Sequence, residues 1–119
     1  MEAIQVAKEI EGKINELELL KKELPAAIYH QGKTAADYDK QLALTIVRLR
    51  NGTEMQFEGY TVKDPPVSIM ERIAKGICWQ EALTMDTAEG KLKAIDSAIK
   101  TTMAQLNGFQ SINRYLAEV

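Results

Sequence analysis

The sequence has little of the material from which disulfide-bonded, membrane-spanning or metal-binding proteins are built. Its 119 residues include one cysteine, one histidine and one tryptophan. A single cysteine excludes an internal disulfide and a cysteine-based zinc cluster. No apolar run approaches the roughly 18 residues needed to cross a bilayer, and charges interrupt the first 13 residues, where a signal peptide would be apolar. We therefore expect a cytoplasmic protein, without membrane contact, made of a single domain.

The chain also lacks an excess of charge and any catalytic pattern. Its formal net charge is −2, so the molecule as a whole has no electrostatic attraction to nucleic acid. His30 has no second ligand or base at helical spacing, which a metal site or a catalytic site would need. The glycines are scattered singly, so no phosphate-binding loop is present. We expect a protein that is not an enzyme and that carries no metal and no cofactor.

What is present is heptad periodicity. Over residues 1–50, 11 of 14 positions at alternating spacings of three and four are apolar, and this predicts a helix with one apolar stripe. The exceptions are Lys21, Gln31 and Thr45. Pro25 and Gly32 predict a kink near 25–33, in one bent helix rather than two separate helices. The predicted stripe comprises Ala3, Ala7, Ile10, Ile14, Leu17, Leu24, Ile28, Ala35, Tyr38, Leu42 and Leu49.

Residues 51–64, within NGTEMQFEGYTVKDPP, predict a β-hairpin. Glu58-Gly59 suits a two-residue turn, because glycine tolerates a positive φ. Pairing Phe57 with Tyr60 places Met55 opposite Val62, so that these four side chains share one face; a bulge in the turn would shift this register by one. An isolated hairpin is marginally stable, so we expect its apolar face to pack on the start of the following helix, near Ile73, Ile77 and Trp79.

A second helical arm is predicted over 66–107. Ser68 and Glu71 have the spacing of a capping box. Gly108 predicts a stop, followed by a short terminal helix over 109–118. The apolar stripe of this arm, interrupted at Thr102 and Asn113, comprises Met85, Ala88, Leu92, Ile95, Ile99, Leu106, Phe109 and Leu116.

The predicted fold class is mainly α: a long antiparallel, coiled-coil-like helical hairpin with a small β-hairpin at its tip. Two helices share only one seam, which buries little surface against the entropy of ordering the chain. We therefore expect a homodimer that forms a helical bundle. The alternative is a chain folded at its kinks into a compact four-helix monomer.

Candidate binding residues lie at Cys78-Trp79, around the hairpin, and at Arg114-Tyr115. Cys78-Trp79 is read as a buried thiol beside a packing tryptophan, although tryptophan also anchors partner surfaces. Near the hairpin, Arg48, Arg50, Lys63, Arg72 and Lys75 exceed the local acidic residues by about one charge, which is weak for nucleic-acid binding. The residues proposed for partner binding are Phe57, Tyr60, Arg72, Lys75, Trp79, Arg114 and Tyr115.

Three segments carry a resemblance to a known group: LRNG before the hairpin, VSIMERIAKGICWQEAL in the second arm, and AQLNGFQSINRYL near the end. Together they resemble small, mostly uncharacterised helical proteins encoded by phages and prophages of low-GC Gram-positive bacteria. The resemblance covers nearly the whole chain and implies a setting among early phage genes, whose small products serve recombination and replication or block host nucleases and defence systems. It assigns no functional residue.

These observations favour a non-enzymatic protein–protein interaction module, an accessory or inhibitory protein that acts on host or phage machinery of DNA metabolism or defence. One alternative is a nucleic-acid-binding accessory of phage recombination or replication. Another is a sponge for a small nucleotide in a dimer pocket, with Trp79, Arg114 and Tyr115 as the first residues to test.

Overall fold

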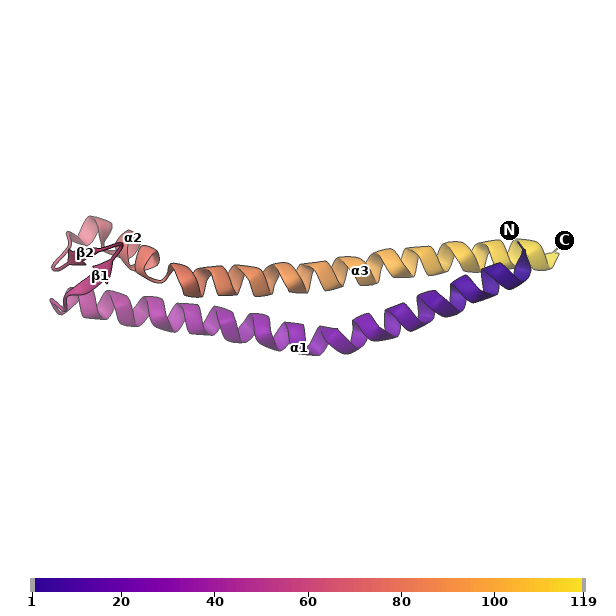
Figure 1. Ribbon diagram of the computed structural model, residues 1–119, viewed down its shortest axis with the longest axis horizontal. Helices are drawn as coiled ribbons and strands as arrows, with labels where there is room; N and C mark the ends of the chain where they lie inside the picture. Colours follow the sequence, from indigo (N-terminus) through magenta and orange to yellow (C-terminus); the bar gives the residue numbers. More distant parts are fainter. Residues whose placement is uncertain (1, 119) are drawn as a thin grey trace. The chain divides into compact units, whose positions relative to one another are not determined.

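The computed structural model describes residues 2–118 (Figure 1). It is mainly helical, with a two-stranded antiparallel sheet, which confirms that part of the predicted fold class. The elements in chain order are α1 (Ala3–Arg50), β1 (Met55–Phe57), β2 (Tyr60–Val62), α2 (Val67–Ile77) and α3 (Trp79–Glu118). They form two compact units: unit 1 holds residues up to 28 and from 90 onward, and unit 2 holds residues 29–89.

The helix boundaries correct three predictions. α3 continues through Gly108 to Glu118, so the predicted stop and the separate terminal helix over 109–118 are wrong. A glycine inside a helix costs only about 1 kcal/mol, too little to end a helix whose apolar face is packed. The second arm is instead divided at Cys78, between α2 and α3. The predicted capping box is absent, because α2 begins directly after Pro66 and Ser68 lies within its first turn.

In unit 1, the start of α1 packs beside the end of α3. Every apolar residue of the predicted second-arm stripe is buried or half-buried, and Thr102, one of its two interruptions, is buried as well. On this part of α1 only every second position of the predicted stripe lies in the seam. Ile10, Leu17 and Leu24 lie in the seam, but the alternate seam positions come one residue earlier than predicted. These earlier positions are Val6, Lys13, Leu20 and Ala27.

The shift of the α1 seam leaves apolar side chains uncovered. Ile14 and Ile28, which the prediction placed in the seam, are 41% and 52% exposed. Lys13 takes a seam position because its aliphatic stem lies along apolar surface, while its ammonium lies 3.2 Å from a carboxylate oxygen of Glu16. α1 is also one continuous helix through Pro25. Because Ile14 and Ile28 lie outside the seam, the apolar face of α1 is wider than the seam that it makes with α3.

Unit 2 has its core where α1 ends and α2 begins. Leu49, Met70 and Ala74 are buried at its centre. The residues packed around them come from α1, both strands and α2: Leu42, Ile46, Met55, Val62, Ile73 and Ile77. The hairpin therefore packs on α2 near Ile73 and Ile77, as predicted. The β-element thus joins the two helical arms and covers the end of their shared core.

Two tight turns hold this end together. After α1, the amide of Thr53 donates to the carbonyl of Arg48 at 3.0 Å, and the amide of Gly52 donates to the carbonyl of Leu49 at 3.2 Å. This is a Schellman motif with glycine in the left-handed conformation (φ 77°). The register of Met55 with Val62 and of Phe57 with Tyr60 is confirmed. Positive φ at both central residues, Glu58 and Gly59, makes the hairpin turn type I′.

Candidate interaction surface

The hairpin meets α2 through one close contact. A Cβ built on Gly76 would lie 3.0 Å from Cζ of Phe57, so the ring packs closely on the backbone of α2 and a side chain at position 76 would press against it. The neighbour of Gly76 across this contact is thus the hairpin's aromatic side chain. Phe57 is half-buried by this contact. Tyr60, predicted to share the packed face, is 74% exposed and does not join the core.

Beside Phe57, α2 and α3 present an uncovered apolar surface. Ile69, Arg72 and Gly76 follow at helical spacings of three and four, and therefore share a face of α2. Backbone hydrogen bonds bridge the break at Cys78, whose amide donates to the carbonyl of Ala74 and whose carbonyl accepts from the amide of Ala82. At the start of α3, Trp79 and Leu83 lie one helical turn apart and are 50% and 58% exposed. We call Phe57, Ile69, Arg72, Trp79 and Leu83 the tip surface.

The structure differs from the prediction in the environment of Trp79 and in two further residues of the tip surface. Trp79 was expected to pack under the hairpin, but half of its side chain faces solvent. Sequence reasoning missed Ile69 and Leu83. The signal that could have found them is their spacing, because Ile69, Gly76 and Leu83 are seven residues apart on a stripe separate from the core residues.

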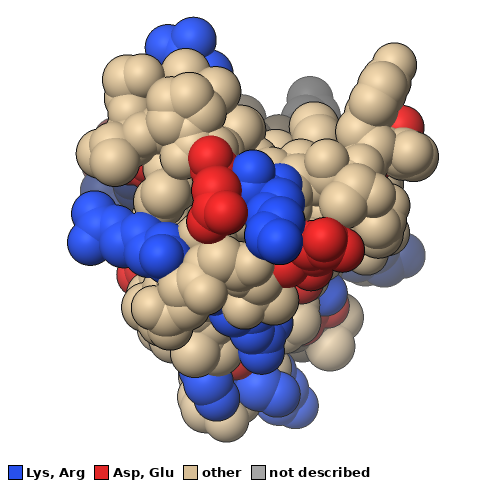
Figure 2. Space-filling view, turned by 90° about the vertical axis from the view of Figure 1, so that its left-hand side faces the viewer, with Lys and Arg blue, Asp and Glu red and all other residues tan. Residues whose placement is uncertain are grey.

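The charges around the tip surface are mixed. Lys75 is exposed and its ammonium lies 3.3 Å from the carboxylate of Glu71, one turn earlier. This end of the molecule has five exposed basic residues and four exposed acidic residues. The basic residues are Arg48, Arg50, Lys63, Arg72 and Lys75, and the acidic residues are Glu54, Glu58, Asp64 and Glu71. Figure 2 looks at the hairpin end and shows basic and acidic side chains next to one another. Tracking a phosphate backbone requires a larger positive excess than one charge.

Cys78 lies inside this end of the molecule rather than on its surface. Its side chain is buried, and its sulfur is 3.4 Å from the hydroxyl oxygen of Thr45 on α1. The predicted buried thiol is therefore confirmed. Thr45, an apparent exception in the apolar stripe, is 3% exposed and finds its partner in this sulfur. A thiol that is enclosed in this way supports packing and is poorly placed to attack a substrate.

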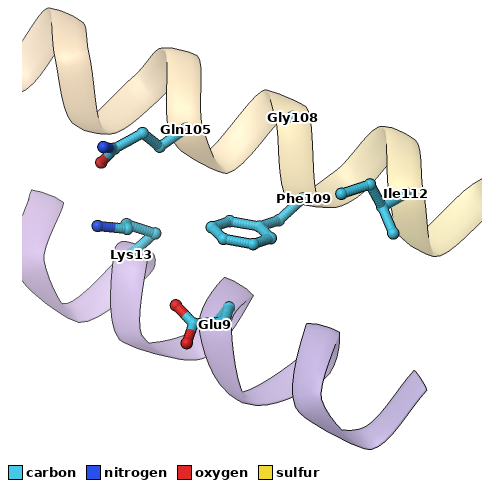
Figure 3. Close-up of a pocket in the computed structure, with 6 residues that line it drawn as sticks. All are labelled: Glu9, Lys13, Gln105, Gly108, Phe109 and Ile112. Atoms are coloured by element: carbon cyan, nitrogen blue, oxygen red, sulfur yellow. The ribbon is translucent and has the colours of Figure 1, made fainter. Parts of the chain in front are cut away.

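Arg114 and Tyr115, the remaining predicted site residues, lie in unit 1 and are exposed. A hollow of about 360 Å³ lies near them between α1 and α3, lined by Glu9, Lys13, Gln105, Gly108, Phe109 and Ile112. In Figure 3 the ring of Phe109 points toward α1 and forms an apolar wall, with Glu9 and Lys13 opposite. One ammonium beside one carboxylate gives no net positive charge, so the lining does not match a nucleotide phosphate.

A second hollow, in unit 2, is polar. It measures about 230 Å³ and is lined by Thr34, Asp37, Gln80, Glu81 and Thr84. Two carboxylates could attract a cation, but residues 2–118 contain no group of three or more acidic, histidine or cysteine side chains placed to hold a metal ion. This hollow therefore defines no metal site.

No helix within the described residues is both long enough and apolar enough to span a bilayer. No family model, no curated protein and no solved structure matches the chain. The fold and the tip surface define a helical protein whose distinctive surface is apolar and aromatic, without a constellation of groups suited to catalysis among the residues that line it.

Proposed function

We propose that this protein is a dimeric protein–protein interaction module that binds a partner protein through the tip surface. The observation that carries the proposal is the half-exposed Trp79, which lies one helical turn from the exposed Leu83 at the start of α3, in the same unit as the Phe57 ring packed on Gly76. Tryptophan and arginine are the residues that most often dominate binding energy at protein interfaces, and Arg72 supplies the second of these.

The size of the apolar contribution supports a protein partner. Full burial of an aliphatic or aromatic side chain is worth roughly 1.5–3 kcal/mol. Covering the exposed parts of Trp79, Leu83 and Ile69 would therefore contribute a few kcal/mol, enough for hot-spot residues to anchor a complex. The mixed charges nearby suit a polar rim around an apolar centre, which is the usual anatomy of a protein interface.

Dimerisation is supported by the surface area that one chain leaves open. The chain has 8476 Å² of accessible surface. A monomeric protein of 13.3 kDa typically exposes about 6,500 Å². The excess is about 2,000 Å², more than the ~800 Å² per partner of a standard interface. A second copy covering part of this excess would complete a four-helix bundle of the coiled-coil-like kind that the heptads predict.

Within this proposal, the resemblance to phage-encoded helical proteins gives the biological setting. The protein would act in the cytoplasm of a Gram-positive host as an accessory or inhibitor of DNA-metabolism or defence machinery. The nucleic-acid-binding alternative receives little support from the near-balanced charges at the tip. The nucleotide-sponge alternative receives little support from the single ammonium in the unit 1 hollow.

The test is affinity capture from host lysate with three proteins: the wild type, a tip variant and a matched control. The tip variant carries Trp79→Ser and Leu83→Ser. The control carries Leu19→Ser, because Leu19 is 62% exposed but lies on α1 in unit 1. All three are first shown to fold by circular dichroism, and each capture is repeated after nuclease treatment.

We expect one stoichiometric protein that survives the nuclease, is retained by the control and is lost with the tip variant. Partners that disappear on nuclease treatment would overturn the proposal in favour of nucleic-acid binding. A protein retained equally by all three would show that the tip surface is not the binding site.

A further inference from the structure

A second uncovered face lies on the part of α1 that belongs to unit 1. It consists of residues spaced seven apart, beside the seam with α3: Ala7, Ile14, Lys21 and Ile28. All four are exposed. The half-buried Ile10, Leu17 and Leu24 separate this row from the buried positions. We call these four residues the outer row; through Ile14 and Ile28 it widens the apolar face of α1 beyond the seam with α3.

The outer row is symmetric about Lys21. Ile14 precedes Lys21 by seven residues and Ile28 follows it by seven. In an antiparallel pair related by a two-fold axis, residue i meets residue j and j meets i. An axis at Lys21 therefore brings Ile14 of each copy against Ile28 of the other.

The surface beside Ile28 is shaped to receive such a side chain. A hollow of about 360 Å³ opens there between α1 and α3, lined by Leu24, Ile28, Leu92, Lys93 and Asp96. Its walls are mostly aliphatic, with a lysine and an aspartate among them. An isoleucine from a second copy would enter this hollow as a knob enters a hole between packed helices.

The charges near the axis are complementary in the same arrangement. Glu18 lies one turn before Lys21 on the same side of α1. In the antiparallel pair, each Lys21 comes within one helical turn of Glu18 of the second copy. The two lysines that meet near the axis are thereby balanced by two glutamates.

We infer that the outer row is a homodimer interface, in which α1 pairs antiparallel with α1 of a second copy about a two-fold axis at Lys21. The occupant of this face is a second copy of the chain because the row, the hollow and the charges are all self-complementary. The inference rests on the dimerisation proposed above and adds its surface, direction and register.

Disulfide trapping tests the register in the full-length chain. Cys78 is 3% exposed, so the parent protein serves as the background and as the control that must not cross-link. The variants are Lys21→Cys, Ile14→Cys, Ile28→Cys and the double variant Ile14→Cys/Ile28→Cys. Each is oxidised mildly, run on a non-reducing gel, and its mass is measured under reducing conditions by sedimentation.

The antiparallel register predicts that Lys21→Cys and the double variant form covalent dimers, whereas Ile14→Cys and Ile28→Cys alone do not. In the two single variants the thiols would lie about 21 Å apart, fourteen residues at ~1.5 Å each, too far for a disulfide. Cross-linking of all the single variants would overturn the inference in favour of a parallel pair. A dimeric mass without cross-linking at Lys21→Cys would overturn the register and leave dimerisation standing. A monomeric parent would overturn both.

Discussion

The contact between Phe57 and Gly76 predicts an unusual response to an alanine substitution. Glycine to alanine in a helix interior normally stabilises a protein, by about 1 kcal/mol. At Gly76, however, the added methyl would lie 3.0 Å from Cζ and 3.3 Å from Cε2 of the Phe57 ring. Overpacking of this kind typically costs about 1–3 kcal/mol. We therefore expect Gly76→Ala to lower the free energy of unfolding by between zero and about 2 kcal/mol. This is the cost of overpacking less the gain in helix propensity.

The chain offers a matched control in Gly90, a helical glycine of α3 with nothing within 4 Å of its added Cβ. Gly90→Ala should therefore show the full gain of about 1 kcal/mol. Urea unfolding at one fixed protein concentration, followed by circular dichroism, compares the two, because stability depends on concentration in a protein that dimerises. The difference between the variants isolates the cost of the Phe57 contact.

A double-mutant cycle completes the test. In a Phe57→Leu background the shorter side chain relieves the contact, so Gly76→Ala should then stabilise about as much as Gly90→Ala. The coupling between positions 57 and 76 should be about 1–3 kcal/mol. If Gly76→Ala stabilises the wild type as much as Gly90→Ala does, the hairpin does not lie on α2 and the description of the tip surface is wrong.

Three further substitutions and one control test the packing and the turns, each by urea unfolding. Leu49→Ala removes a fully buried core side chain and should cost about 2–5 kcal/mol; a cost below 1 kcal/mol would contradict the core. Gly59→Ala forces alanine to φ 80° and should cost roughly 1–2 kcal/mol, whereas Gly12→Ala, with open space around it, should stabilise. Thr45→Val replaces a hydroxyl whose partner is the weakly bonding thiol of Cys78, and should stay within about 1 kcal/mol of the wild type.

Much of this architecture could be predicted from periodicity, because an apolar stripe and the seam that it makes usually coincide. On α3 the longest apolar stripe is the predicted one, and the structure buries or half-buries every apolar residue in it. On α1 two overlapping stripes compete. Ile14 and Ile28 are more hydrophobic than Lys13 and Ala27, which occupy the seam instead. Composition cannot choose between them, because a lysine stem packs well in a seam and because an isoleucine outside it can serve a second interface such as the one proposed here.

The candidate site was less predictable for a different reason. The turn and register of the hairpin follow from local chemistry at Glu58-Gly59, and the structure confirms them. Trp79 is the first residue of α3, directly after the break at Cys78, so whether it faces inward or outward depends on the path of the chain at this break. The nearest glycine, Gly76, lies inside α2, two residues before this break. The break coincides with the buried contact between Thr45 and Cys78, a tertiary interaction between residues 33 positions apart.

The most direct test of the account is the mass of the native protein in solution, because a dimeric interaction module requires a second copy on α1 while the tip surface stays open. Sedimentation equilibrium across a range of micromolar concentrations should give about 26.6 kDa, twice the chain mass of 13.3 kDa. A mass of 13.3 kDa that is constant across this range would contradict the account, and would leave the outer row of α1 without the partner that its symmetry predicts.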